Sequence, residues 1–116
     1  MHIGIIIHIE IQVNLWQNKT MEFVTDKKIV DLLERIEKIC KNNNVSHLYL
    51  FGSYAKNTER PGSDLDIVVK GVKDINKLKE EIDAIRTFTI INLFDYDRIK
   101  NNYLKEDIDA YAKVIY

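Results

Sequence analysis

Two short segments of the chain carry residue types that can bind a phosphate and a cation. Gly52 and Ser53 follow one apolar run, and Asp64 and Asp66 stand one residue apart at the start of another. A glycine where a strand gives way to a helix lets backbone N–H groups approach an anion, and the serine hydroxyl adds a donor. Two carboxylates on one face of a strand lie roughly 7 Å apart and repel each other unless a cation lies between them. Hard oxygen ligands of this kind suit Mg²⁺.

The elements that must position these residues follow from the spacing of the apolar side chains. Alternation puts Asp64 and Asp66 on the opposite strand face from Leu65 and Ile67. Helical and alternating segments follow one another along the chain, which indicates an α/β domain with a core sheet of three strands flanked by helices. We expect helices over 25–44, 75–86 and about 104–112, one helical turn after Gly52, and strands over 45–51, 64–70 and 88–94.

The first twenty residues form a separate extension in this interpretation. Apolar residues alternate strictly from Ile3 to Leu15, which predicts a strand that could extend the sheet or pair with a second copy of the chain. Polar residues interrupt this run and no basic segment precedes it, so we expect neither a signal peptide nor a membrane span. The alternative is that Met21 is the natural start. The globular domain is expected over 21–116.

Composition limits the classes of protein to consider. A length of 116 residues suits one domain. The 17 basic and 18 acidic residues give a net charge of −1, so there is no broad electrostatic signal for nucleic acid. Cys40 falls on the apolar face of a predicted helix, which indicates core packing. As the single cysteine it cannot form an internal disulfide, which suits a cytoplasmic protein.

The combined pattern Gly-Ser-x10-Asp-x-Asp, within "FGSYAKNTERPGSDLDIVV", resembles the nucleotidyltransferases related to DNA polymerase beta. The surrounding residues are similar to the minimal nucleotidyltransferases (MNT proteins), and the resemblance covers about 25–116. It implies the nucleotidyltransferase fold with a small mixed sheet, and nucleotidyl transfer from an NTP with release of pyrophosphate. The resemblance implies a metal site at Asp64 and Asp66 and a nucleotide site at Gly52, Ser53, Lys56 and Ser63.

Two departures from the family pattern fall just after "GSYA". Lys56 and Asn57 stand where the family usually has Arg-Gly. Asparagine is the best substitute for glycine where the backbone must be left-handed, so the turn can survive. Lys56 still supplies a cation near a phosphate, although it lacks the bidentate fork of arginine.

The third departure concerns the carboxylate that the family places on the next strand. Aligning "IINLFDYD" puts Asn92 at that position, where an amide oxygen can ligate a metal but cannot accept a proton. Asp95 has the opposite parity, so only a bulge or the end of the strand could turn it toward Asp64 and Asp66. We favour Asn92 as the third catalytic residue, with Asp95 as the alternative.

The resemblance also implies a partner and a reaction. MNT proteins are antitoxins paired with helical HEPN-domain toxins, and the known type transfers AMP from ATP to a tyrosine of the toxin with Mg²⁺. The first hypothesis is therefore a protein adenylyltransferase. The second is an MNT-fold antitoxin, weakened as a catalyst by Asn92, that neutralises the toxin by binding. A third is a transferase that acts on a small molecule.

Overall fold

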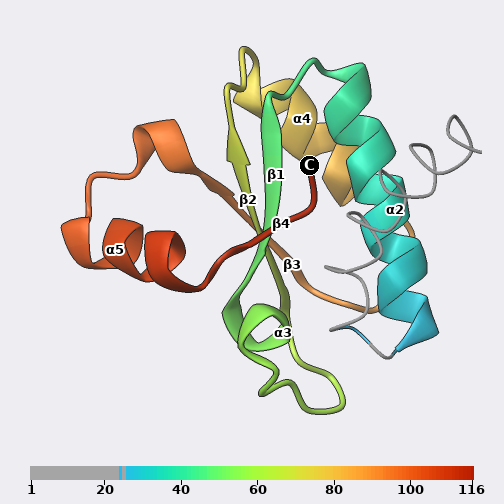
Figure 1. Ribbon diagram of the computed structural model, residues 1–116. Coiled ribbons are helices and arrows are strands. Elements are labelled where there is room, and N and C mark those ends of the chain that lie inside the picture. The colour runs from blue at the N-terminus through green and yellow to red at the C-terminus, as the bar shows by residue number, and fades with distance from the viewer. Residues whose placement is uncertain (1–23, 25) are drawn as a thin grey trace, which may run out of the picture.

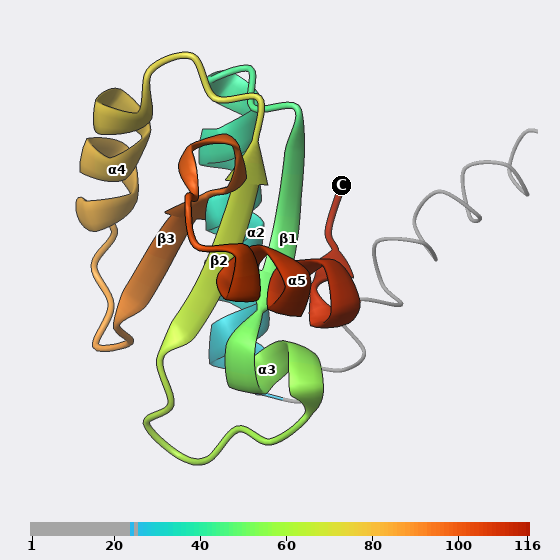
Figure 2. The same cartoon turned by 90° about the vertical axis from the view of Figure 1, so that its left-hand side faces the viewer.

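The computed structural model describes Val24 and residues 26–116, which form one sheet with helices on both faces (Figures 1 and 2). The predicted N-terminal strand and the domain boundary at residue 20 lie outside the described residues. None of the helices in the described part combines the length and the apolar character needed to cross a bilayer. The elements in chain order are α2 (Lys27–Asn42), β1 (His47–Phe51), α3 (Gly52–Lys56), β2 (Leu65–Lys70), α4 (Ile75–Asp83), β3 (Ile91–Asp95), the 3₁₀ turn η1 (Tyr96–Arg98), α5 (Asn102–Tyr111) and β4 (Lys113–Val114).

The sheet has the strand order β3-β2-β1-β4 and mixes both kinds of pairing. Strand β1 is antiparallel to β2 and β4, whereas β2 is parallel to β3. The parallel pair requires a crossover, and α4 supplies it between β2 and β3. The three predicted core strands are β1 to β3, and β4 adds two residues beside β1. The predicted α/β fold with a small mixed sheet is thus confirmed.

One face of the sheet packs against α2 and α4 (Figure 1). Leu65, Ile67 and Val69 of β2 are fully buried there, as their alternation predicts. Asp26 caps helix α2, and its carboxylate accepts a hydrogen bond from the N–H of Lys28 (2.9 Å). Its apolar stripe completes the layer with the buried residues Ile29, Leu32, Leu33, Ile36 and Cys40.

The opposite face is covered by α5, which crosses in front of the strands in Figure 2. Val68 points to this face and packs with Phe51 of β1 and Ile108 of α5. Asp66 lies two residues before Val68 and therefore shares its face. Asp66 is half-buried rather than part of this cluster, so the apolar cover ends at the carboxylate.

Strand β3 begins later than the sequence predicts. The expected strand over 88–94 starts at Ile91, because Phe88 is fully exposed and Ile90 is 62% exposed. Alternation of apolar residues predicts a strand over this segment, but exposed apolar side chains are common in folded proteins and do not extend the pairing with β2. The carbonyl of Ile90 accepts a hydrogen bond from the N–H of Leu65 (2.8 Å), which leads the segment into the sheet.

Helix α4 begins where predicted and ends earlier. The carboxylate of Asp74 caps its first turn by accepting a hydrogen bond from the N–H of Lys77 (3.1 Å). The predicted helix over 75–86 ends at Asp83, after which the N–H of Ile85 donates to the carbonyl of Ile82 (3.1 Å). This tighter i→i−3 bond is typical of a helix end and turns the chain away from the helix axis.

Two ionisable groups of the α2 side of the core are shielded from solvent, Cys40 fully and Tyr116 in part. Cys40 is fully buried, and its burial, with a smaller effect from the charge of Glu37, raises the pKa of the thiol to about 12. The Tyr116 hydroxyl donates to the carbonyl of Val45 (2.9 Å), and burial raises the pKa of this phenol as well. Both groups stay neutral at physiological pH, so Cys40 is a packing residue rather than a reactive thiol.

Candidate active site

Asp64, Asp66 and Asn92 come together at one end of the parallel strand pair, and we call them the Asp–Asn–Asp cluster. Asp66 is the register partner of Asn92, so their side chains leave adjacent strands on the same face. The Asn92 Nδ2 atom donates to Asp66 Oδ1 at 2.7 Å and to Asp64 Oδ2 at 3.2 Å. Both carboxylates therefore direct an oxygen at the Asn92 Nδ2 atom.

The amide of Asn92 offsets the repulsion between the two carboxylates. Its two N–H donors face one acceptor each, and hydrogen bonds to a charged acceptor are stronger than those between neutral groups. Asp64 is exposed and Asp66 is half-buried, so the cluster is open to solvent on the side of Asp64. A ligand can therefore reach the carboxylates without rearrangement of the core.

Gly52 lies against the Asp66 carboxylate. The preceding residue, Phe51, is the register partner of Asp66, and Gly52 itself has φ +65°. A Cβ on Gly52 would stand 2.1 Å from Asp66 Oδ2, far inside van der Waals contact. Glycine is therefore required here both by the left-handed backbone and by the carboxylate, and it brings the start of α3 next to the cluster.

Helix α3 is a short turn of helix closed by a left-handed residue. Asn57 has φ 58° and ψ 38°, and its N–H donates to the carbonyl of Ser53. The N–H of Thr58 donates to the same carbonyl at 2.9 Å. The expectation that asparagine maintains a left-handed position is thus confirmed. Ser53 is half-buried, one residue beyond the glycine that touches Asp66.

Asp95 lies away from the cluster. Its register partner is Val69, three residues along β2 from Asp66, and it has the parity of the α2 face. Its Oδ2 atom lies 3.4 Å from Nε of Arg98, and only 9% of its side chain is exposed. Strand β3 carries no bulge that would turn Asp95 back, since its five residues pair in unbroken register with β2. Of the two candidates for the third position, Asn92 is the one beside the aspartates.

Residues 34–116 match the family described as "Polymerase beta, Nucleotidyltransferase". The chain belongs to this nucleotidyltransferase family. A Methanocaldococcus jannaschii protein named "Putative protein adenylyltransferase MJ0128" is 32% identical over 90 residues, which cover 73% of this chain and 92% of that protein.

Two solved structures share the fold. A chain of a toxin–antitoxin crystallised with AMP-PNP superposes with a TM-score of 0.54 at 24% identity, over 72% of this chain and 71% of that one. A mutant of the toxin–antitoxin MntA–HpeT gives a TM-score of 0.51 at 21% identity, over 72% of this chain and 70% of that one. The family match and the M. jannaschii relative confirm the nucleotidyltransferase family that the motif predicts, and the two solved structures confirm its fold.

Lys56 of this nucleotidyltransferase contacts α5 instead of the Asp–Asn–Asp cluster. Its Nζ atom lies 3.3 Å from Asp107 Oδ2, 4.7 Å from the centre of the Tyr111 ring and 5.6 Å from that of Phe51. Asp107 could not be predicted as the partner of Lys56, because a carboxylate on an exposed helix face 51 residues away leaves no local signal in the sequence. In this arrangement Lys56 ties α3 to α5 and so fixes the helix that follows Gly52.

Ser63 closes the turn that precedes the aspartates. Its N–H donates to the carbonyl of Arg60 (2.9 Å), and its hydroxyl oxygen accepts from the N–H of Arg60 (2.8 Å). Pro61 and Gly62, the latter with φ +83°, occupy the centre of this turn, which is the sequence preference of a type II turn. Ser63 thus sets where the chain enters β2 and where Asp64 points.

The donor set of the Asp–Asn–Asp cluster fits a divalent cation such as Mg²⁺. Oxygens of Asp64 and Asp66 converge on one point, and carboxylates are the ligands that this cation prefers. No group of three or more His, Cys, Asp or Glu residues that could hold a metal occurs within the described residues. The cluster therefore supplies two charged ligands, and the Asn92 amide can contribute a neutral oxygen only after its N–H₂ group turns away from the carboxylates.

Proposed function

We propose that the chain is an antitoxin-type, Mg²⁺-dependent nucleotidyltransferase that transfers AMP from ATP to a tyrosine of a partner HEPN toxin. The convergence of Asp64 Oδ2 and Asp66 Oδ1 beside Gly52 is the observation that carries this proposal. Membership of the nucleotidyltransferase family supports the reaction class. The name of the M. jannaschii relative supports a protein acceptor, and the toxin–antitoxin structures support a toxin as that acceptor.

The proposed reaction is an in-line displacement at the α-phosphorus of ATP. A bond forms between the tyrosine oxygen and the phosphorus, the bond to the bridging oxygen breaks, and pyrophosphate leaves. Mg²⁺, when bound, neutralises charge on the attacking and leaving oxygens. Asp64 and Asp66 would hold it, while Gly52 and Ser53 would contact the phosphates.

The proton of the tyrosine hydroxyl needs an acceptor in this reaction. Asn92 cannot provide one, because an amide does not take up a proton near neutral pH. Within the Asp–Asn–Asp cluster only the two aspartates are bases, and Asp64 is the more exposed of them. Transfer of this proton to Asp64 or to water therefore replaces the role of a third carboxylate.

A second function has an observation in its favour. The Asn92 amide already joins the two carboxylates by hydrogen bonds, so the cluster is satisfied without a cation. A chain in that state could neutralise a toxin by forming a complex with it and transfer no AMP.

The experiment that tests the proposal combines intact-mass measurement with a protection assay. The chain and its toxin are produced together, and the toxin is weighed with wild-type protein, with Asp64→Asn and with Asp66→Asn. We expect a mass increase of one AMP with the wild type, and none with either variant. Asp83→Asn serves as the matched control, because Asp83 is exposed on α4 and pairs only with Lys79 among the described residues.

The outcomes separate the two functions. An unmodified toxin in the presence of wild-type chain, Mg²⁺ and each NTP refutes nucleotidyl transfer. If the Asp64→Asn/Asp66→Asn double variant still protects cells, binding alone accounts for the antitoxin effect. Loss of protection in the double variant, with the complex still formed, refutes the binding function.

A further inference from the structure

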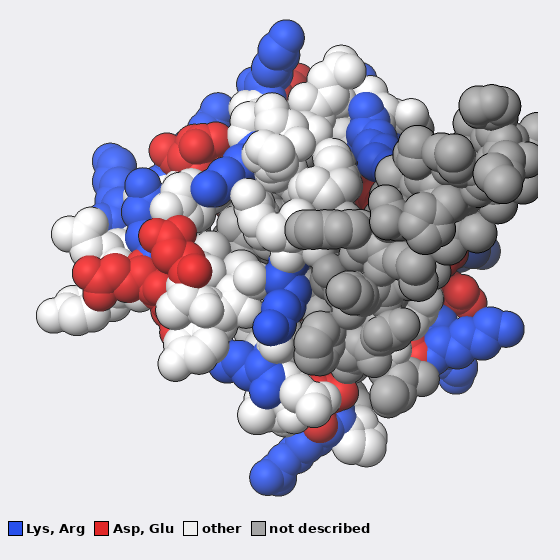
Figure 3. Space-filling view, in the orientation of Figure 1, with Lys and Arg blue, Asp and Glu red and all other residues white. Residues whose placement is uncertain are grey.

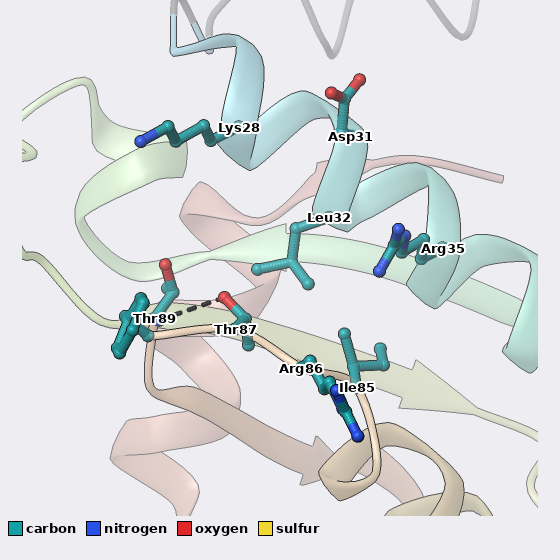
Figure 4. A pocket seen from close by; sticks show the side chains of 9 residues that line it. Lys28, Asp31, Leu32, Arg35, Ile85, Arg86, Thr87 and Thr89 are labelled. Atoms are coloured by element: carbon teal, nitrogen blue, oxygen red, sulfur yellow. Dashed lines mark hydrogen bonds between the residues drawn. The ribbon is translucent and has the colours of Figure 1, made fainter.

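A groove opens between α2 and residues 85–89, on the side of the sheet away from α5 (Figure 4). Its volume is about 370 Å³, within the usual range for ligand pockets. We call it the basic groove. Its lining includes the cations Lys28, Arg35 and Arg86, the apolar residues Leu32 and Phe88, and Thr89.

The basic groove has an excess of positive charge that the chain does not neutralise. Lys28, Arg35 and Arg86 form no ion pair within the described part of the chain. Asp31 is the one acidic residue along the groove, and its carboxylate points away from residues 85–89 in Figure 4. Arg35 lies on α2 beside Leu32 in the same view, and the charged ends of Lys28 and Arg86 extend outward into solvent around the groove. An occupant with negative charge would therefore meet cations without a competing carboxylate.

The apolar part of the groove favours a polypeptide as that occupant. Leu32 is buried and reaches toward residues 85–89 from α2, so it gives the groove an apolar floor. Phe88 of the lining is fully exposed, and Ile90, the residue after Thr89 of the lining, is 62% exposed. Exposed aromatic residues beside arginines are typical of the centres of protein–protein interfaces.

Nucleic acid is the less suitable occupant. The chain has 17 basic and 18 acidic residues, and the described basic and acidic side chains that are visible in Figure 3 are interspersed. A backbone of phosphates needs a continuous basic track rather than three cations around an apolar floor.

The basic groove adjoins the Asp–Asn–Asp cluster around the edge of the sheet. The carbonyl of Ile90 accepts the hydrogen bond of Leu65 N–H at 2.8 Å, and Leu65 lies between the two aspartates in sequence. Ile90 directly follows the groove residue Thr89 and stands two residues before Asn92 in the chain, at the start of the edge strand β3. A polypeptide that is seated on Phe88 and continues past Ile90 would thus reach the sheet edge at which Asn92 lies.

We infer that the basic groove docks an acidic segment with an apolar side chain that belongs to the acceptor protein. This inference rests on the proposed function, because it supplies the surface that holds the acceptor next to the aspartates. The acidic residues of the segment pair with Arg35, Arg86 and Lys28, and the apolar side chain covers Leu32 and Phe88. Docking in this way raises the local concentration of the acceptor tyrosine at the site.

Fluorescence anisotropy with a fluorescein-labelled peptide of alternating glutamate and phenylalanine tests the inference. We expect the wild-type chain to bind this peptide and not its counterpart with lysine in place of glutamate. The double variant Arg35→Glu/Arg86→Glu and the single variant Phe88→Ala should each weaken binding by about tenfold or more. Lys38→Glu, on an exposed position of α2 outside the groove, and Tyr103→Ala, on α5, should bind as the wild type does.

Melting temperatures within a few degrees of the wild type establish that the groove variants fold. Equal binding by the wild type and the groove variants, or no binding at all, overturns the inference. Displacement of the peptide by a single-stranded oligonucleotide at lower concentration than by unlabelled peptide would assign the groove to nucleic acid and also overturn it. Asp64→Asn/Asp66→Asn should keep the peptide affinity, so a failure of AMP transfer and a failure of docking give different results.

Discussion

Replacement of Asn92 by aspartate tests how the Asp–Asn–Asp cluster tolerates its charges. The substitution preserves the shape of the side chain and removes the two donors that reach Asp66 at 2.7 Å and Asp64 at 3.2 Å. It also sets a third carboxylate where those donors were. We expect the variant to be less stable than the wild type without a cation and to bind Mg²⁺ more tightly.

The magnitude follows from the two contacts. The bond to half-buried Asp66 contributes about 1.5 kcal/mol, and the bond to exposed Asp64 contributes less. Like charges about 3 Å apart repel by about 1.4 kcal/mol in water, and rotation of the new carboxylate relieves part of this repulsion. The free energy of unfolding should therefore fall by about 3 kcal/mol, which lowers the melting temperature by roughly 12 °C in a domain of this size. Saturating Mg²⁺ at a hundredfold excess over Kd restores about 2.7 kcal/mol.

Thermal unfolding in EDTA and in MgCl₂ measures both effects, and transfer of AMP to the toxin reports on catalysis. Asn76→Asp is the control, because it makes the same change on the exposed surface of α4. If Asn92→Asp melts with the wild type in EDTA and gains no stability from Mg²⁺, the amide does not offset the repulsion and this reasoning is wrong. A gain of AMP transfer would show that the native residue limits catalysis through the missing charge.

Three further predictions concern the surroundings of the cluster and the core. Gly52→Ala should lower the free energy of unfolding by about 1–2 kcal/mol through its left-handed backbone alone. It should also weaken Mg²⁺ binding in titration calorimetry, because the new Cβ displaces the Asp66 carboxylate. An unchanged Mg²⁺ affinity would contradict the close approach of Gly52 to Asp66. Asn57→Gly should keep the melting temperature, whereas Asn57→Ala should lower it by several degrees, and equal melting of the two would refute a left-handed requirement. The free energy of unfolding measured in urea should fall as the pH rises above about 9, because the Cys40 thiol has a pKa of 9.0 when unfolded and about 12 when folded. The raised pKa of Tyr116 acts in the same direction. Cys40→Ala should show a shallower decline with pH.

Periodicity alone predicted most of the fold. The alternation of Leu65, Ile67 and Val69 identified β2 and its buried face, because a strand with one apolar face must pack that face against the core. The stripe on α2 and the caps at Asp26 and Asp74 fixed two helices by local contacts. Phe88 and Ile90 show where this reasoning ends, since an alternating apolar segment can also remain exposed.

The motif around Gly52 and the two aspartates was likewise visible in the sequence, because its residues lie within fifteen positions of one another. The role of Gly52 was only partly visible. Its flexibility suggested close approach to a ligand, and the structure places the Asp66 carboxylate against it. That contact depends on the pairing of β1 with β2, which local composition does not specify.

Sequence therefore determined which residues could bind a nucleotide and a cation, since residue type and spacing fix the chemistry within one segment. Tertiary structure decided which distant residues join them. The parallel register of β2 and β3 placed Asn92 between Asp64 and Asp66 and left Asp95 on the other face. The packing of α2 beside residues 85–89 likewise placed Arg35 and Arg86, which are far apart in the sequence, along the same groove. Register and helix packing are long-range properties, because they depend on how complete elements bury their apolar faces against each other.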